Sequence, residues 1–112
     1  MKENDLYGTW KYIKVEDPNT HPPDTTSAEE IKFADPSITF HPNGKLEMIW
    51  EGKTLSHGTY KIDGNMIRYH ELLDSGRTHD FPFLVSELSD SKIVFETMRR
   101  EEATKVTAIK AK

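Results

Sequence analysis

Short runs of alternating apolar and polar residues fill most of the chain, and turn residues separate them every 8 to 14 positions from Pro36 onward. β-Branched and aromatic side chains dominate these runs, as is typical of strands with one buried face. The pattern predicts eight strands, at residues 8–16, 37–41, 45–51, 55–62, 65–73, 78–88, 92–99 and 103–110. Because the links are short, consecutive strands should pair antiparallel. The sequence therefore predicts an all-β fold, an eight-stranded antiparallel up-and-down β-barrel.

One long segment between the first two strands breaks this pattern. Residues 17–36 contain four of the six prolines and show no alternation. Thr26 or Ser27 can cap a short helix over residues 28–33, with two glutamates in its first turn. Connections of this length are commonly functional. We expect this segment to form a flap over one end of the barrel.

The hairpin turns set an expected register for the later strands. Asn43-Gly44 and Asp63-Gly64 are the strongest turn signals, because Asn-Gly and Asp-Gly supply the positive φ that tight hairpins need. Loops at residues 63–64, 75–77 and 89–91 predict the pairs Tyr60–Ile67, Gly58–Tyr69, His57–His70, Tyr69–Phe83, Ile67–Val85, Glu71–Phe81, Phe83–Thr97, Val85–Phe95 and Phe81–Arg99. In this register one face, which we take as the interior, collects Leu46, Met48, Trp50, Tyr60, Ile62, Ile67, Tyr69, Phe81, Phe83, Val85, Ile93 and Phe95.

The first strand carries apolar residues on both faces. Trp10 and Tyr12 share one face, whereas Ile13 and Val15 fall on the other. Either a β-bulge switches the faces midway, or the flap covers the outer side through Ile31 and Phe33. Both devices can operate together.

We expect the chain to form a single domain, residues 1–112. Its composition excludes several kinds of functional site. The absence of cysteine excludes a disulfide scaffold, a thiolate nucleophile and a cysteine-based zinc site. A net charge of −4 argues against nucleic acid as a partner. No apolar run is long enough for a membrane-spanning helix or a secretory segment. The chain is thus either cytoplasmic as written or an exported protein without its signal, and its location stays open.

Several motifs resemble the lipocalin superfamily, and most closely the small bacterial lipocalin-like domains of the calycin group. The motifs are Leu6-Tyr7-Gly8-Thr9-Trp10-Lys11, residues 38–45 (ITFHPNGK), residues 58–65 (GTYKIDGN) and the segments 83–88 and 91–94. The resemblance covers nearly the whole chain except the flap. It implies an eight-stranded barrel whose mouth holds one small ligand. It also implies a structural role for Gly8 and for Trp10, which would pack at the closed end under a basic side chain, matched here by Lys110.

Fatty-acid-binding proteins open with a similar strand but have ten strands and a helix pair. Their carboxylate-binding Arg-x-Tyr would fall on Lys105-Val106-Thr107, where both residue types are absent. A fatty-acid site of that design is therefore not expected.

The mouth should lie at the end covered by the flap, because tight turns and Trp10 close the other end. The inward positions near it are Trp50, Glu71, Phe81 and Arg99. On one interpretation Arg99 holds a polar headgroup while the apolar part of the ligand contacts the barrel wall. On the other, Glu71 and Arg99 form an ion pair at the rim that contributes little stability. The candidate ligand-binding residues are Met48, Trp50, Tyr60, Tyr69, Glu71, Phe81, Phe83, Thr97 and Arg99.

Metal binding and catalysis are weakly supported. His57 and His70 are expected to be cross-strand partners on the outer face, but no third ligand is evident and zinc sites normally need three or four. Ser56 and His57, like His70 and Glu71, are sequence neighbours that point to opposite faces of a strand. Phosphate loops and nucleophile-elbow motifs are absent. We therefore expect no metal site, no cofactor and no enzymatic activity.

Two functions remain open at this point. The first is non-catalytic binding of a small apolar or amphipathic molecule in the barrel. The second is a protein-interaction module, such as an inhibitor or immunity-type partner, whose barrel is filled by its own side chains. The sequence does not reveal the oligomeric state.

Overall fold

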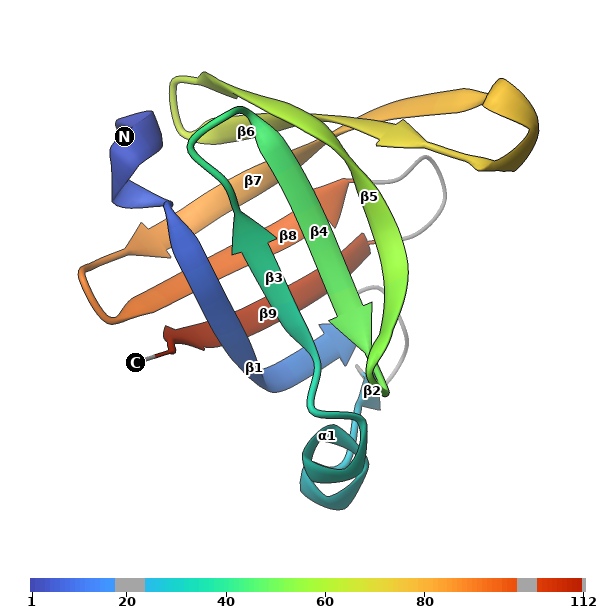
Figure 1. Cartoon of the computed structure of the whole chain (residues 1–112). Helices are drawn as coiled ribbons and strands as arrows, with labels where there is room; N and C mark the ends of the chain where they lie inside the picture. The colour runs from blue at the N-terminus through green and yellow to red at the C-terminus, as the bar shows by residue number, and fades with distance from the viewer. Residues whose placement is uncertain (18–23, 99–102, 112) are drawn as a thin grey trace.

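The chain folds into a closed β-barrel with one short helix outside it, in a computed structural model that describes residues 1–17, 24–98 and 103–111 (Figure 1). The strands are β1 (Gly8–Asp17), β2 (Asp24–Thr25), β3 (Ser37–Phe40), β4 (Lys45–Trp50), β5 (Lys53–Asp63), β6 (Met66–Leu72), β7 (Thr78–Leu88), β8 (Lys92–Met98) and β9 (Ala103–Lys110). The helices are the 3₁₀ turns η1 (Glu3–Asp5) and η2 (Asp74–Gly76) and the α-helix α1 (Ala28–Ala34).

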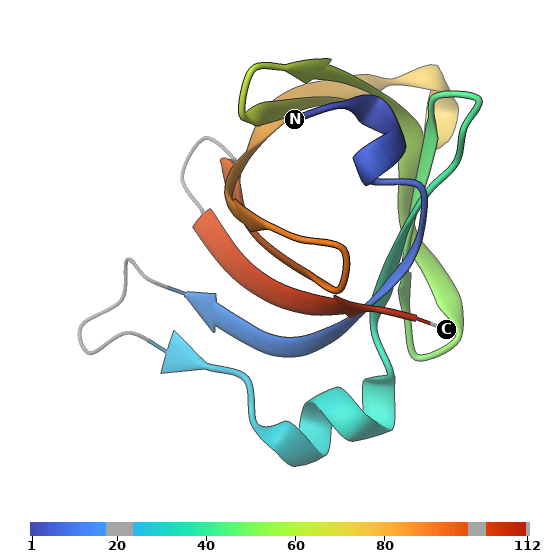
Figure 2. The same cartoon turned by 90° about the vertical axis from the view of Figure 1, so that its left-hand side faces the viewer.

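The sheet closes because its first and last long strands pair. Its order is β2-β1-β3-β4-β5-β6-β7-β8-β9, and β1 also pairs with β9. Every neighbouring pair is antiparallel. The ring of strands is visible in Figure 2. The eight-stranded antiparallel barrel predicted from the sequence is therefore confirmed, and β2 is a short addition to one edge of β1.

The flap contains a strand that the sequence pattern did not reveal. Asp24 and Thr25 of β2 pair with Asp17 and Glu16 at the end of β1. Two residues are too few to show an alternating pattern. The expected helix is confirmed as α1, and the Ser27 hydroxyl caps it by accepting a hydrogen bond from the backbone N–H of Glu30.

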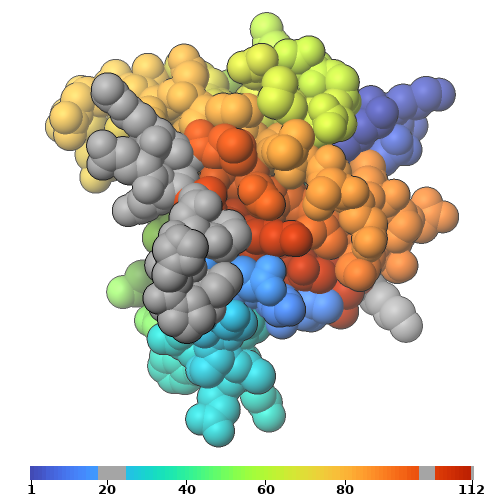
Figure 3. Space-filling model, turned by 180° about the vertical axis from the view of Figure 1, so that it is seen from behind, coloured from blue at the N-terminus to red at the C-terminus, as the bar shows by residue number. Residues whose placement is uncertain are grey.

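Helix α1 covers the outer side of β1 with only one of the two expected apolar residues. Ile31 is buried, whereas Phe33 is 78% exposed. The helix projects from the barrel in the view from behind (Figure 3). The pairing of β1 with β9 shifts between Tyr12 and Lys14, so a bulge also switches the faces of β1. The bulge in β1 and the helix that covers its outer side, the two explanations that the sequence left open, are therefore both present.

Two of the three expected hairpin registers were wrong by two residues. Asp63 pairs with Met66, so the β5–β6 loop is Gly64-Asn65 and not Asp63-Gly64. The observed pairs are Tyr60–Tyr69 and Ile62–Ile67, with Thr59 and not His57 opposite His70. The β6–β7 loop is longer than expected and contains η2, so the pairs become Ile67–Phe83, Tyr69–Phe81 and Glu71–His79. The predicted pairs Phe83–Thr97 and Val85–Phe95 are confirmed, and Phe81–Arg99 lies outside the described residues.

The residues predicted to face the interior do so despite these register errors. A register shift of two residues keeps each side chain on its original face, because strand side chains alternate with a period of two. Ten of the twelve residues predicted to face inward are buried, and Trp50 and Ile62 are half-buried. Leu6, Trp10, Ile38, Phe40, Val106 and Ala108 complete the same core.

Candidate functional site

The closed end of the barrel is sealed by the N-terminal segment and Trp10. Leu6 is fully buried, and its carbonyl accepts a hydrogen bond of 2.9 Å from the Trp10 indole N–H. Helix η1 lies in front of the ring of strands in Figure 2. The Lys110 ammonium stands 4.5 Å from the centroid of the Trp10 ring and donates to the carbonyl of Tyr7. A cation in this position is attracted by the electron-rich face of the indole.

Gly8 allows the lysine to reach this place. Its φ is +114°, and a Cβ there would lie 2.9 Å from the Lys110 ammonium. A larger residue would therefore be strained and would push Lys110 away from the Trp10 ring. The structure thus brings together Gly8, Trp10 and Lys110, the three residues expected at the closed end.

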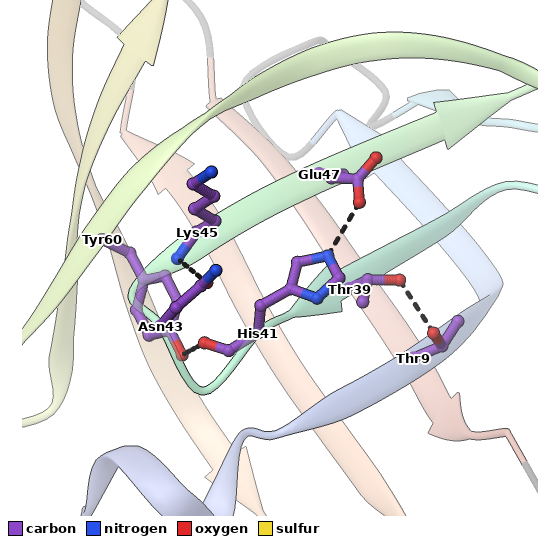
Figure 4. Close-up of polar contacts among 7 residues, drawn as sticks. All are labelled: Thr9, Thr39, His41, Asn43, Lys45, Glu47 and Tyr60. Atoms are coloured by element: carbon purple, nitrogen blue, oxygen red, sulfur yellow. Dashed lines mark hydrogen bonds and ion pairs between the residues drawn. The ribbon is translucent and has the colours of Figure 1, made fainter.

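Tyr60 belongs to the closed end and not to the mouth. Its ring meets Phe40 edge-to-face at 5.2 Å, and its hydroxyl donates to the His41 carbonyl at 2.9 Å (Figure 4). Burial is the main reason that the pKa of Tyr60 rises to about 12, and the charges of Glu3 and Tyr7 add to it. On the outer face nearby, His41 and Glu47 interact at 2.7 Å.

Aromatic rings form a continuous group across the interior. Tyr69 lies 5.4 Å from both Phe81 and Phe83, and Phe83 stacks on Phe95 at 5.3 Å. Tyr12 meets Phe95 edge-to-face at 6.2 Å. These rings come from β1, β6, β7 and β8. They give the interior a wide apolar wall.

A directed chain of hydrogen bonds lies beside these rings, towards the mouth. Ser56 donates to a carboxylate oxygen of Glu71 at 2.5 Å and lies 2.6 Å from the Tyr69 hydroxyl. Because Ser56 has a single hydroxyl proton, Tyr69 must donate to Ser56. Glu71 is only 4% exposed, and His79 Nδ1 lies 3.6 Å from its other oxygen. The arrangement keeps a carboxylate inside an otherwise apolar barrel by satisfying it with hydrogen bonds.

The Tyr12 side chain packs against the core from β1 and is half-buried. Every buried side-chain nitrogen or oxygen of the described residues has a hydrogen-bond partner. Tyr12 points inward, and its hydroxyl makes no hydrogen bond within residues 1–17, 24–98 and 103–111, yet the side chain keeps accessible surface. Burial, with a smaller contribution from Tyr69, raises the pKa of Tyr12 far above its usual value. Tyr12 therefore contributes its ring, through the contact with Phe95, to the apolar wall of the interior.

The remaining candidate residues are spread around this end of the barrel. Met48 is buried and pairs with Ser56, whereas Trp50 is half-buried next to the turn between β4 and β5. Thr97 is half-buried, and its hydroxyl donates to the Thr104 carbonyl at 3.5 Å. Arg99, and with it the alternative of a Glu71–Arg99 ion pair, lies outside the described residues.

The histidines do not form the expected pair. His57 stands opposite Glu47, whereas His70 stands opposite Thr59 and bonds to Asp80 on the outer face of the β6–β7 hairpin. The two-residue register error accounts for the mistaken pairing. Within the part of the chain that the structure describes, there is no group of three side chains suited to hold a metal ion.

Sequence reasoning missed Ser56 and His79 as members of the site. Ser56 shares its strand face with Gly58 and Tyr60, so parity alone could have placed it in the interior. His79 would have required the correct β6–β7 register, which sets it opposite Glu71.

Structural comparison identifies the type of barrel. The fold is similar to the crystal structure of a lipocalin-like protein from Bacteroides uniformis ATCC 8492, with a TM-score of 0.61 and 18% sequence identity. The alignment covers 96% of this chain and 99% of the other. No protein-family model and no curated protein sequence matches the chain. The fold is therefore lipocalin-like, in agreement with the resemblance seen in the sequence motifs. Within the described residues, no helix has the length and apolar character needed to cross a membrane.

Proposed function

We propose that this protein binds a small apolar or amphipathic molecule inside its barrel and does not catalyse a reaction on it. The observation that carries the proposal is the buried Glu71 carboxylate, which the Ser56 hydroxyl links to Tyr69 of the aromatic wall. Apolar aromatic walls with a few converging polar groups are the usual composition of a ligand site. The lipocalin-like fold is typically a binding scaffold and typically non-catalytic, which is consistent with this role.

Each part of the proposed site has a distinct role. The apolar portion of the ligand contacts Phe81, Phe83 and Met48, and its polar end lies near the Ser56–Glu71 hydrogen bond. Arg99, which the sequence register sets opposite Phe81, is the proposed partner of a negatively charged headgroup. Tyr60 lies at the closed end in contact with Phe40, so it bounds the interior at the end away from the proposed polar headgroup.

Three probes with one chain length and different headgroups test this function. Titration calorimetry with lauric acid, lauryl alcohol and laurylamine should detect binding of all three, because the apolar chain supplies the shared part of the affinity. Replacing Arg99 with alanine should weaken lauric acid about tenfold and leave the alcohol unchanged. Arg68→Ala is the matched control, since Arg68 is exposed and bonded to Asp63. Absence of measurable binding for all three probes would contradict the proposal.

A second function is favoured by the close aromatic packing. Five rings lie within 5.3 to 6.2 Å of their neighbours, which is the spacing of a well-filled core. A filled barrel would instead present its outer surface to a protein partner, as in an inhibitor or immunity-type module. Failure to bind any of the three probes, together with binding of a protein, would favour this alternative.

A further inference from the structure

The barrel wall opens between β5 and β6 at the mouth end. The last backbone pair between these strands is Gly58–Glu71. Beyond it, β5 continues back to Lys53 paired only with β4, and Leu72 of β6 pairs only with β7. Figure 1 shows the β6–β7 hairpin leaving the barrel while β5 stays with β4. The backbones of β5 and β6 therefore separate at this end, although the two strands pair continuously from Asp63–Met66 to Gly58–Glu71.

Local geometry fixes where the strands separate. Gly58 approaches β6 so closely that a Cβ at this position would overlap the carbonyl oxygen of His70. The pairing of β4 with β5 shifts between Met48 and Ile49, which leaves Leu55 as an extra residue in β5. A bulge of this kind bends its strand and increases its twist. The close crossing at Gly58 followed by the bulge at Leu55 therefore directs β5 away from β6.

Side chains, and not backbone bonds, close the wall beyond this point. Ser56 lies two residues past the last paired residue of β5, and its hydroxyl bridges to Glu71 and Tyr69 of β6. A single side-chain hydrogen bond contributes little net free energy, so it breaks more readily than a continuous backbone ladder. Ser56 therefore contributes a contact that holds the two strands together at the edge of the opening.

The outer rim of the opening is unusually apolar for a surface. Leu55 is 66% exposed on β5, and Leu72 and Leu73 are each 41% exposed on the β6 side. Of these leucines Leu72 lines a surface hollow of about 650 Å³, together with Thr54 and His57, on the outer side of the same stretch. Exposed apolar side chains around a concave region are characteristic of binding surfaces. Here they lie on the outer side of the wall whose inner side carries Ser56 and Glu71.

We propose that the ligand enters the barrel laterally between β5 and β6, and that the Ser56–Glu71 hydrogen bond closes this entrance. The proposal rests on the ligand-binding function proposed above and specifies the route to that site. The leucines receive the apolar part of the ligand from water, and it passes Ser56 to reach the aromatic wall. The ligand class that fits is a slender amphipathic molecule, because the Ser56 hydroxyl has to leave Glu71 and Tyr69 to let it pass.

Crosslinking the two strands tests the route. The chain has no cysteine, so the pair His57→Cys and Leu72→Cys introduces the only thiols, one on each side of the opening. A bis-maleimide then joins them. The matched control joins Lys61→Cys to Arg68→Cys, which are direct partners on the same two strands where these are already paired. Stopped-flow fluorescence with anilinonaphthalene sulfonate measures the association rate of each protein before and after crosslinking.

Crosslinking across the opening should slow association by about tenfold or abolish it, whereas the control crosslink should leave the rate unchanged. Ser56→Ala, without any crosslink, should raise both the association and the dissociation rates. Equal association rates before and after crosslinking at positions 57 and 72 would overturn the lateral route while leaving the binding function intact. Failure of the unmodified protein to bind the dye at all would instead overturn the proposed function.

Discussion

Ser56 and Glu71 join two strands at the place where their backbones separate. Their hydrogen bond of 2.5 Å joins Ser56, two residues beyond the last paired residue of β5, to Glu71 of the last β5–β6 backbone pair, and the Tyr69 hydroxyl completes the chain of donors. The Ser56 hydroxyl thus has two roles: it closes the barrel wall, and it donates a hydrogen bond to the buried Glu71 carboxylate.

Replacing Ser56 with alanine should lower the free energy of unfolding by about 1–3 kcal/mol, because Tyr69 loses its acceptor and Glu71 loses a donor. Urea denaturation measures the change. Ser86→Ala is the control, since Ser86 is exposed and its hydroxyl makes only a 3.4 Å contact with the Val94 carbonyl. Equal effects of the two substitutions would show that the Ser56 hydrogen bonds contribute nothing specific.

Replacing Gly58 with alanine should destabilise the barrel by about 1–3 kcal/mol or more, because the new methyl group would force β5 and β6 apart. The substitution should also increase amide hydrogen exchange in β6. Gly52→Ala is the control: Gly52 has a φ of +75°, but a methyl group added there would meet no heavy atom within 4 Å. A larger loss of stability for Gly52→Ala than for Gly58→Ala would contradict this explanation.

Replacing Lys110 with methionine should remove both the cation above Trp10 and the bond to the Tyr7 carbonyl, while keeping an unbranched side chain that is only one atom shorter. We expect a loss of about 1–3 kcal/mol and a changed Trp10 fluorescence spectrum. Lys45→Met on the exposed surface serves as the control. An unchanged unfolding midpoint for Lys110→Met would mean that apolar packing alone closes this end.

Stability should fall at alkaline pH through Tyr60. Its pKa is raised to about 12 in the folded protein, above its usual value of about 10, so the folded state holds the phenol proton more tightly than the unfolded chain does. The stabilisation is complete below pH about 10 and is lost as the pH rises towards about 12. The stability difference between the protein and Tyr60→Phe should therefore shrink over this range. A constant difference would contradict the burial of the phenol.

The sequence predicted the barrel, its strands and its interior because these depend on the parity of side chains along each strand. Both register errors shifted the pairing by two residues, which preserves the face of every residue. Tyr69 and Phe81 were thus correctly assigned to the interior although their partners were wrong. The same error was serious for His57 and His70, because a direct contact depends on the exact partner and not on the face.

The polar part of the site was harder to predict. Glu71 was recognised as an inward carboxylate, but its contact with Ser56 crosses strands that no longer pair at that point. Counting from a hairpin loop cannot locate such a contact, because it depends on where the strands separate. The separation itself follows from the crossing at Gly58 and the bulge at Leu55, and neither has a signature in the alternation pattern.

The proposal on which the others depend is that the barrel contains a small molecule, and mass spectrometry of the purified protein is its sharpest test. Spectra recorded under native and then denaturing conditions should show a bound species that is released when the chain unfolds. Its headgroup would identify the chemistry recognised near Glu71. A native mass equal to that of the bare chain, together with no gain in the fluorescence of anilinonaphthalene sulfonate, would contradict the proposal and indicate a barrel filled by its own side chains.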